Sequence, residues 1–476
     1  MRKHQQDPLL NGGGSTNSGV NGNGNGNGTV LSSFRMLAPR PTSIEDTYLS
    51  KQFLVELISK HLYDAGGLTI SQLVHRVCLS GAVIEEILNY LRQESRLEVL
   101  PRLGQSKELY YSLTDLGRIA GQEAMNKSGY IGPAPVPVSE YEKVVQAQSV
   151  HRVIIKQKET QQAFQDIVIR SSLLDQLGPA MNSGRSIVIY GPPGTGKTYI
   201  SQRLTRLLTD ACLIPYAISV NESIIQLYDP LVHKAVDPDA NSDGRPNLLF
   251  NEGHDPRYKL CKRPVVISGG ELTLDMLEVK YEPSTKIYRA PLQLKANNGM
   301  YIIDDMGRQR VSPVELFNRW IYPMEERKDL LSLANGNSFE VPFDEILIFS
   351  TNINPLELGD AAFLRRIGHK VFFDTLDEYA FTEIWKKVCI EKQIEFDQTL
   401  LTYLFEEHYQ REQRPLLPCH PRDILGIAQD KALYLADPGK LSEELIDWAW
   451  KSYFVKLDQE KDQFAYTGEL SGGHHV

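Results

Sequence analysis

The chain has 476 residues, which is more than one ordinary domain holds, so two or three folded units are expected. Hydrophobic residues make up 41% and charged residues 23%, as in globular proteins, and the net charge of −9 argues against a chain-wide nucleic-acid footprint. The five scattered cysteines indicate neither a disulfide framework nor a zinc site, and they fit a reducing cytoplasm. No apolar run approaches the roughly 18 to 20 residues of a membrane helix, and no signal peptide opens the chain. We therefore expect a cytoplasmic protein without membrane insertion.

The two ends of the chain have compositions that do not support a folded core. Residues 1–43 contain a Gly/Asn-rich stretch that buries no apolar surface, so we expect a disordered leader there. Residues 457–476 are polar and contain Gly-Gly-His-His near the end. We interpret this segment as a tail and not as a source of metal ligands.

Residues 44–127 show the pattern of a small α+β domain. Apolar residues from Phe53 to Leu62 recur at helical spacing, and Gly66-Gly67 ends that helix. The elements expected next are a short strand at 68–70, helices at 71–78 and 82–95, strands at 97–100 and 109–113 around a turn at 104–106, and a helix capped by Thr114. This order resembles a winged helix, in pattern only.

The charge of this winged-helix-like domain bears on its partner. Residues 45–126 carry 8 Lys/Arg and 11 Asp/Glu, a net charge of −3. The would-be recognition helix contains Glu85, Glu86 and Glu94 but only Arg92 as a cation, and a phosphate backbone repels such a face. We favour a protein-interaction role, with DNA binding kept as the alternative.

Residues 128–150 are expected to form a linker. Pro133, Pro135 and Pro137 fall within five positions, which favours an extended, semi-rigid spacer. Beyond it, residues 151–376 read as an α/β domain. Residues 377–456 read as a small bundle of four helices at about 378–394, 397–412, 421–436 and 442–455, supported by apolar spacing such as Phe381, Ile384, Trp385 and Val388.

A nucleotide-binding loop stands near the start of the α/β domain. The apolar run 186–190 leads into Gly191, Pro192, Pro193, Gly194, Thr195, Gly196, Lys197 and Thr198, followed by a helical pattern. A strand, the motif G-x-x-x-x-G-K-T and a helix form the context that a phosphate-binding loop requires. Its glycines let backbone N–H groups face the phosphates, Lys197 neutralises the β- and γ-phosphates, and the Thr198 hydroxyl binds Mg²⁺. ATP and Mg²⁺ are the expected ligands.

Two further strands end in polar residues that such a site needs. The run 299–303 leads into Asp304, on the metal side, and Asp305, where a water-polarising carboxylate belongs. The run 345–349 leads towards Asn352, whose amide is suited to positioning water against the γ-phosphate. For Asn352 a simple turn is an equally open interpretation, because Asn354-Pro355 is turn-like.

Taken together, these residues resemble the AAA+ ATPases over about 161–454. The loop 191–198 looks like that family's Walker A motif, YIIDD at 301–305 its Walker B motif, and STN at 350–352 its sensor 1. The segment 363–366 resembles the arginine-finger segment, which implies that Arg365 or Arg366 reaches the ATP of a neighbouring subunit. Arg422, in HPRD at 420–423, resembles sensor 2 at the start of a lid helix. The resemblance implies a P-loop NTPase parallel sheet with a C-terminal helical lid, in a homo-oligomeric ring, as a hexamer.

Within that superfamily, the stretch from Pro323 to Pro355 is similar to MoxR-like ATPases, which carry insertions before the Walker B strand and before sensor 1. Lys197 and Asp304 lie 107 residues apart, which leaves room for an insertion near 225–298. Two positions depart from the pattern. Asp305 replaces the usual Walker B glutamate and is one methylene shorter, and the double arginine looks more like protein-remodelling branches. Arg365 and Arg366 could equally cap their helix and face solvent, and Arg422 could pair locally with Asp423.

The combined reading is an ATPase that remodels or assembles protein complexes, with the winged-helix-like domain as its adaptor for an unknown protein client. Catalytic roles fall to Lys197, Asp305, Asn352, the two arginines and Arg422. One alternative is a DNA-associated regulatory ATPase, which needs a basic stripe that the sequence does not obviously supply. The other is a nucleotide switch with little turnover, which the short Asp305 side chain suggests.

Overall fold

The computed structural model describes residues 36–100, 108–236, 253–358, 361–435 and 441–454. The first 35 residues, the predicted turn at 104–106 and the predicted tail lie outside these ranges. Residues 36–43, assigned to the leader, are described, and Ala38 is 4% exposed within a hydrophobic core. The carbonyl of Ala38 accepts a hydrogen bond from Asp255 N at 2.8 Å, so the folded part begins earlier than the composition indicates.

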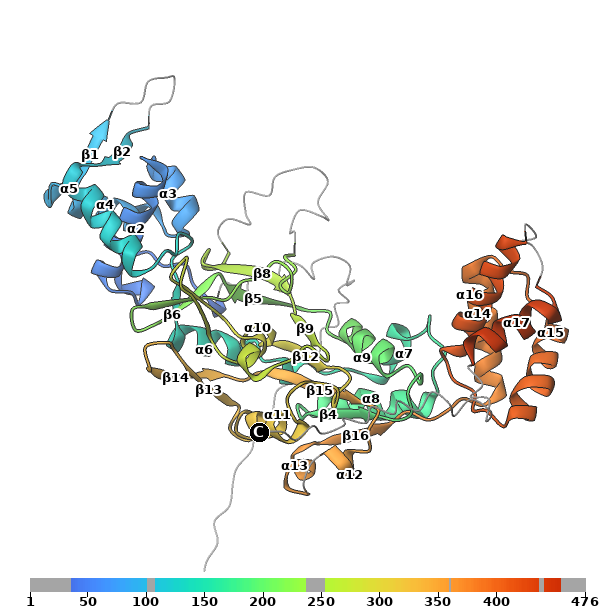
Figure 1. The fold of residues 1–476 in the computed structure, drawn as a ribbon. Helices are drawn as coiled ribbons and strands as arrows, with labels where there is room; N and C mark the ends of the chain where they lie inside the picture. Colours follow the sequence, from blue (N-terminus) through green and yellow to red (C-terminus); the bar gives the residue numbers. More distant parts are fainter. Residues whose placement is uncertain (1–35, 101–107, 237–252, 359–360, 436–440, 455–476) are drawn as a thin grey trace, which may run out of the picture.

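Helices and a hairpin form the N-terminal unit (blue to cyan in Figure 1). The helices predicted there are confirmed, with ends shifted by one or two residues. Only Leu68 of the predicted strand 68–70 pairs, in a bridge with Tyr111, because Thr69 already caps the next helix with its side chain. Thr114 accepts from Gly117 N and caps the last helix as predicted. The elements are α2 (Lys51–Ala65), α3 (Ile70–Val77), α4 (Gly81–Gln93), β1 (Leu97–Leu100), β2 (Tyr110–Leu113) and α5 (Asp115–Lys127).

The segment 128–150 differs from the predicted extended spacer. It contains β3 (Val136–Pro137), which pairs with another strand, and α6 (Val138–Ala147). Tyr130 and Ala134 are buried in the same hydrophobic core as the N-terminal helices, together with Ala217 and Ile224. The prolines restrict the backbone conformation, but the segment is not exposed to solvent, because apolar side chains between them pack against the rest of the protein. The N-terminal unit is therefore docked and not loosely tethered.

A five-stranded parallel sheet forms the centre of the protein, as predicted for the α/β domain. Its strand order is β16–β4–β15–β12–β9. Because every strand is parallel, their carboxyl ends meet at one edge, and β15 lies between β4 and β12. The strands are β4 (Ile187–Tyr190), β9 (Val265–Ser268), β12 (Gly299–Ile303), β15 (Glu345–Thr351) and β16 (His369–Phe372).

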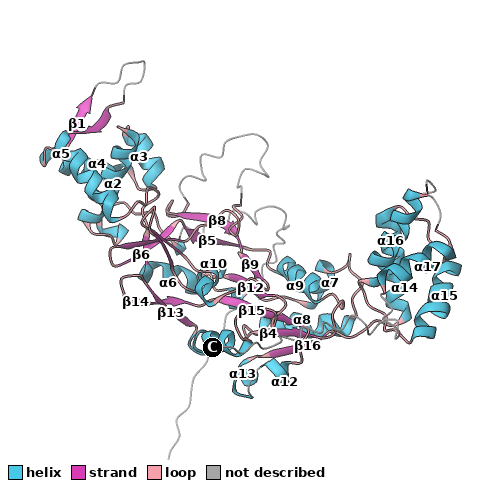
Figure 2. Cartoon of the chain, in the orientation of Figure 1, coloured by secondary structure: helices cyan, strands magenta, loops and turns pink. Residues whose placement is uncertain are grey.

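Helices cover both faces of this sheet (Figure 2). On one face, Ile187, Met300 and Ile346 share a core with residues of α8 and α9. On the other face, Tyr301 and Phe349 share a core with α10 and α11. Strands buried on both faces read as continuous apolar runs, which is why the sequence reveals them. The helices are α7 (Gln157–Ala163), α8 (Ser171–Asn182), α9 (Lys197–Arg203), α10 (Leu292–Ala296), α11 (Pro313–Glu326), α12 (Pro355–Leu358) and α13 (Ala361–Arg366).

A second, mixed sheet has the order β10–β11–β7–β6–β3. Its strands β10 and β11 lie within the predicted insertion at 225–298, whereas β3 and β6 lie outside it. A separate antiparallel pair, β5 (Ala211–Pro215) with β8 (Tyr258–Lys262), lies beside it, and β13 (Lys328–Ser332) pairs with β14 (Ser338–Pro342) ahead of β15. The remaining strands of the mixed sheet are β6 (Ala217–Val220), β7 (Ser223–Gln226), β10 (Lys280–Glu282) and β11 (Ile287–Arg289).

The C-terminal unit is helical, as predicted, and stands apart from the sheets in Figure 1. Its core gathers Phe381, Trp385 and Trp450 from different helices. The second predicted helix is α-helical only at its start and continues as a π-helix over Leu404–Gln410. The α-helices are α14 (Glu378–Lys392), α15 (Gln398–Tyr403), α16 (His420–Tyr434) and α17 (Glu443–Tyr453). None of the helices in the described ranges is long and apolar enough to cross a membrane.

Candidate nucleotide-binding site

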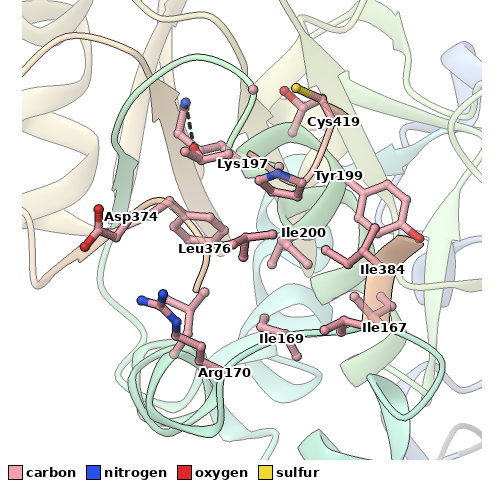
Figure 3. A pocket seen from close by; sticks show the side chains of 18 of the residues that line it. Ile167, Ile169, Arg170, Lys197, Tyr199, Ile200, Asp374, Leu376, Ile384 and Cys419 are labelled. Atoms are coloured by element: carbon pink, nitrogen blue, oxygen red, sulfur yellow. Dashed lines mark hydrogen bonds between the residues drawn. The ribbon is translucent and has the colours of Figure 1, made fainter. Parts of the chain in front are cut away.

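The glycine-rich loop follows β4 and turns back on itself. Gly194 and Gly196 have φ of 81° and 85°, a left-handed conformation that favours glycine. Lys197 opens α9 and is 6% exposed. Its Nζ donates to the carbonyl oxygens of Gly191 at 3.0 Å and Pro192 at 2.7 Å, so the ammonium lies inside the curve of the loop (Figure 3). A phosphate-binding loop places its lysine in the same way with respect to its own backbone.

A cavity of about 830 Å³ opens beside this loop and brings the predicted residues together. Its lining includes Lys197, Thr198, Asp305, Asn352 and Arg422, which come from the loop, two strand ends and the C-terminal helices. The cavity thus extends from the carboxyl edge of the parallel sheet to α14 and α16. Lys197 and Asn352 line the same cavity, and Asp304 is not part of its lining.

Asp304 and Asp305 follow β12 at that edge. Asp304 is half-buried, and its Oδ1 accepts from Asp305 N at 3.0 Å. Asp305 has φ of 50°, which is uncommon for a residue with a side chain and marks a backbone held by its surroundings. Asn352 Nδ2 donates to Asp305 Oδ1 across 3.5 Å, a long contact. Of the two carboxylates, Asp305 lines the cavity and Asp304 does not.

Electrostatics link the loop to these carboxylates. Burial lowers the pKa of Lys197, and the nearby charges of Asp305 and Asp304 oppose that shift. The carboxylates therefore help to keep the ammonium charged in a partly dry site. A cation and two carboxylates at this spacing suit a ligand that carries both phosphates and a divalent metal.

Arg422 lies in the first turn of α16 and lines the cavity. It does not pair with Asp423, which was the local alternative. Its Nη2 instead donates to both carboxylate oxygens of Glu391 on α14, at 3.0 and 2.9 Å, while Asp423 accepts from the Tyr453 hydroxyl. The side chains of Arg422 and Glu391 are 58% and 60% exposed, so this ion pair is weak and can exchange for another anion.

Arg365 and Arg366 lie on α13 and are not part of the cavity lining. Arg366 Nε donates to Glu325 of α11 at 2.5 Å. The structure therefore does not bring these arginines to the nucleotide cavity of their own chain. The sequence alternatives, a role in a neighbouring subunit or a position that faces solvent, both agree with this placement.

Several lining residues escaped the sequence analysis. Ile167, Ile169, Leu376 and Ile384 gather as an apolar wall, with Arg170 and Asp374 at one side (Figure 3). Arg308 also lines the cavity, three residues after Asp305. Cys419 lies against the loop, since a Cβ on Gly194 would meet its Sγ at 2.8 Å. Apolar residues scattered over three segments leave no local pattern, so sequence spacing gave no signal for this wall.

Comparisons with known proteins give limited information. Residues 377–452 match a family model described as "Domain of unknown function (DUF8689)", which covers the C-terminal helices only. No curated protein matches the chain. Among solved structures, the RuvB Holliday junction branch migration motor of Thermotoga maritima is 13% identical with a TM-score of 0.32, over 63% of this chain and 70% of RuvB. NtrX from Brucella abortus is 13% identical with a TM-score of 0.39, over 62% of this chain and 58% of NtrX. We take no residue role from either.

Proposed function

We propose that this protein is a Mg²⁺-dependent ATPase of the AAA+ type. The observation that carries the proposal is the single cavity lined by Lys197, Thr198, Asp305 and Asn352. In the proposed site, backbone amides of the loop and Lys197 hold the phosphates, and Arg422 contacts the γ-phosphate from α16. The apolar wall around Ile167 and Ile169 offers a surface for the flat adenine base.

The residues present fit Mg²⁺. Thr198 supplies a hydroxyl at the cavity, and Asp305 lines it next to Asp304, the carboxylate that we propose for the metal side and that directly follows β12. Mg²⁺ prefers oxygen ligands and usually takes one or two protein side chains plus phosphates and water. The described ranges hold no group of three or more His, Cys, Asp or Glu that could bind a metal without such a ligand. When bound, Mg²⁺ would neutralise charge on the phosphate oxygens.

In the proposed reaction Asp305 and Asn352 orient the attacking water. Their 3.5 Å contact places the Asn352 amide beside the Asp305 carboxylate, so one water in the cavity can accept a hydrogen bond from the amide and donate one to the carboxylate. Asp305 is shorter than glutamate, and this supports a second candidate, a slow nucleotide switch. Steady-state ATPase rates of the wild type and Asp305→Glu separate the two, because a silent wild type that Glu activates favours the switch.

The test of the site assignment is Lys197→Ala. We expect it to lower the ATP hydrolysis rate by about 10³-fold, because the variant loses the cation that stabilises the phosphates in the transition state. Lys280→Ala is the matched control, since Lys280 is exposed and lies on β10 away from the cavity. Wild-type hydrolysis by Lys197→Ala contradicts the proposed function.

We further propose a homo-oligomeric ring, a hexamer, in which Arg365 or Arg366 completes the site of a neighbour. The placement of α13 outside the chain's own cavity supports this role. Mixing Lys197→Ala chains with chains that carry Arg365→Ala and Arg366→Ala tests it. Hydrolysis in the mixture, with none in either variant alone, is expected. A mixture as inactive as its components would contradict action between subunits.

For the biological role we propose remodelling or assembly of protein complexes, with residues 44–127 contacting an unknown protein client. The net charge of −3 over residues 45–126 and the similarity of residues 323–355 to MoxR-like ATPases support a protein client over DNA. A pull-down with a hydrolysis-blocked variant is the direct test. Salt-dependent binding of duplex DNA by the full chain, lost when residues 44–127 are altered, would favour the DNA-associated alternative.

A further inference from the structure

The residues that follow β12 form a tight turn with two side chains facing the cavity. Asp305 and Gly307 have φ of 50° and 103°, and Arg308 N donates to Asp305 O at 3.0 Å. This reversal returns the chain to the cavity within one turn. Asp305 and Arg308 both line the cavity as a result, whereas Met306 between them is buried.

The turn is fixed by hydrogen bonds on both of its sides. Towards β15, Met306 N donates to Ser350 O, and Thr351 Oγ1 donates to Met306 O, both at 2.8 Å. Towards β9, Gln309 Nε2 donates to Gly269 O at 3.2 Å and to Asp304 O at 3.1 Å, while its Oε1 accepts from Gly307 N. These hydrogen bonds fix the backbone position of Arg308, although its side chain is 68% exposed.

The Arg308 side chain has a weak ion-pair contact with Asp305. Its Nη1 lies 3.9 Å from Asp305 Oδ2, at the limit of an ion pair and with both groups largely exposed. Such a pair contributes little energy, so the guanidinium can turn to a stronger anion. Arg310, two residues further, is also exposed but does not line the cavity.

The carboxylates that follow β12 create a need for a further cation near a bound triphosphate. Asp304 and Asp305 place two carboxylates beside a single buried ammonium, Lys197, and both carboxylates would repel a triphosphate. Lys197 Nζ contacts the loop carbonyls. In the proposed site Asp305 orients the attacking water, which puts Asp305 next to the terminal phosphate. A second cation next to Asp305 is therefore placed to meet the γ-phosphate and not the phosphates of ADP.

We propose that Arg308 is a phosphate-binding residue that contacts the γ-phosphate of ATP within its own chain and distinguishes ATP from ADP. This inference rests on the proposed function. It differs from the arginines of α13, which lie outside the cavity, and from Arg422, which approaches from the C-terminal helices. Guanidinium groups suit phosphate oxygens because their N–H groups form paired, charge-assisted hydrogen bonds.

The test compares Arg308→Ala with Arg310→Ala, which removes a neighbouring exposed arginine outside the cavity. Affinities are measured with Mg²⁺ and either a non-hydrolysable β,γ-imido ATP analogue or ADP. We expect Arg308→Ala to weaken binding of the analogue roughly 10- to 100-fold, the effect of one lost charge-assisted hydrogen bond. ADP affinity stays at the wild-type value, Arg308→Lys recovers part of the loss, and Arg310→Ala behaves as wild type. Thermal melting checks that every variant is folded.

Other outcomes contradict the inference in recognisable ways. Unchanged affinity with a lower hydrolysis rate would make Arg308 a positioning residue for Asp305 and overturn phosphate binding. Equal loss for ADP and the analogue would overturn the discrimination. Restored hydrolysis on mixing Arg308→Ala with Lys197→Ala chains would show action between chains and overturn the assignment to its own chain. If Lys197→Ala binds the analogue as tightly as wild type, the proposed function fails; if only Arg308→Ala does, the site stands and this inference fails.

Discussion

The two edges of the parallel sheet handle polar groups in opposite ways. At the carboxyl edge, Asp305 has a strained backbone, and its contacts with Asn352 and Arg308 are 3.5 and 3.9 Å long. At the amino edge, Asp344 accepts hydrogen bonds of 2.6 Å from both Ser149 Oγ and Asn298 Nδ2. One edge keeps hydrogen-bonding capacity for a ligand, and the other uses it within the protein.

The network at the amino edge is buried and extensive. Val150 N donates to Asp344 Oδ2 at 2.9 Å, and Gln148 Nε2 donates to Asn298 Oδ1 at 2.8 Å. Arg263, which is 7% exposed, donates to the carbonyl oxygens of Gln148 and Asn298 at 2.9 and 2.7 Å. These bonds join the segment after α6 to the starts of β9, β12 and β15. We therefore expect this edge to govern stability and the other to govern chemistry.

The largest effect is expected from Asp344→Asn. In the variant, an NH₂ group that donates hydrogen bonds replaces one carboxylate oxygen of Asp344. The neighbouring groups already donate, so some of these buried donors lose their acceptor. We expect the free energy of unfolding to fall by about 3 kcal/mol, measured by urea denaturation. Under conditions in which the variant is folded, its ATP affinity should not change, because Asp344 is not part of the cavity lining.

The matched variant at the other edge is Asp305→Asn. Its side chain is 48% exposed, and asparagine tolerates a positive φ, so we expect stability to change by no more than about 0.5 kcal/mol while hydrolysis falls. The distinction between the edges breaks down if Asp305→Asn loses as much stability as Asp344→Asn, or if Asp344→Asn loses ATP affinity while folded.

Glu345, the first residue of β15, is an exception at the stable edge. It is 3% exposed, neither carboxylate oxygen has a hydrogen-bond partner, and burial with Asp329 and Asp344 nearby raises its pKa well above the usual value. The unfolded chain therefore releases this proton at lower pH than the folded chain. As the pH rises above about 4.5, the free energy of unfolding falls, because unfolding lets Glu345 ionise.

We expect Glu345→Met to increase the free energy of unfolding by about 2 kcal/mol at pH 7, because a buried polar group without partners is removed. Urea denaturation at several pH values should show the gain growing as the pH rises from 4.5, by at most about 1.4 kcal/mol per unit. A gain that is constant with pH would mean that Glu345 is ionised in the folded protein.

The sequence predicted the features that depend on residues close together in the chain and missed those that depend on distant contacts. The loop 191–198, the strands that end at Asp304 and near Asn352, and the four C-terminal helices depend on short-range patterns: glycine spacing, apolar runs and helical periodicity. The segment 128–150 was wrongly expected to be a spacer, because its fate is decided by Tyr130 and Val136 packing against strands about 80 residues further along the chain.

Within the site, the sequence failed where side chains meet through distant partners. Arg308 reaches the cavity because the turn after β12 is held by Gly269, which follows β9, and by Ser350 and Thr351 of β15. Arg422 was placed at the right helix, but its partner Glu391 lies on α14, 31 residues away. Spacing along the chain predicts which groups a strand end carries, and tertiary contacts decide which groups face each other.

The smallest expected effect concerns the contact between the loop and the C-terminal unit. In Gly194→Ala, the new Cβ would meet Cys419 Sγ at 2.8 Å and Leu417 Cδ1 at 3.3 Å, at a φ of 81°. We expect ATP affinity to fall about five-fold, equivalent to about 1 kcal/mol, since the loop must adopt a strained conformation and shift away from α16. Gly336→Ala is the matched control, because Gly336 has a similar φ of 85° but no atom within 4 Å of the added Cβ.

A double variant separates the two causes. Adding Cys419→Ala removes the closest atom while leaving the strained φ, so it should recover part of the ATP affinity lost in Gly194→Ala and change nothing in Gly336→Ala. If Cys419→Ala gives no recovery, the loss comes from the backbone alone, and the packing of residues 417–419 on the loop is unimportant for binding. Full recovery would instead show that the C-terminal unit contacts the phosphate-binding loop directly when ATP binds. The ligand site would then include the start of α16 as well as the carboxyl edge of the sheet.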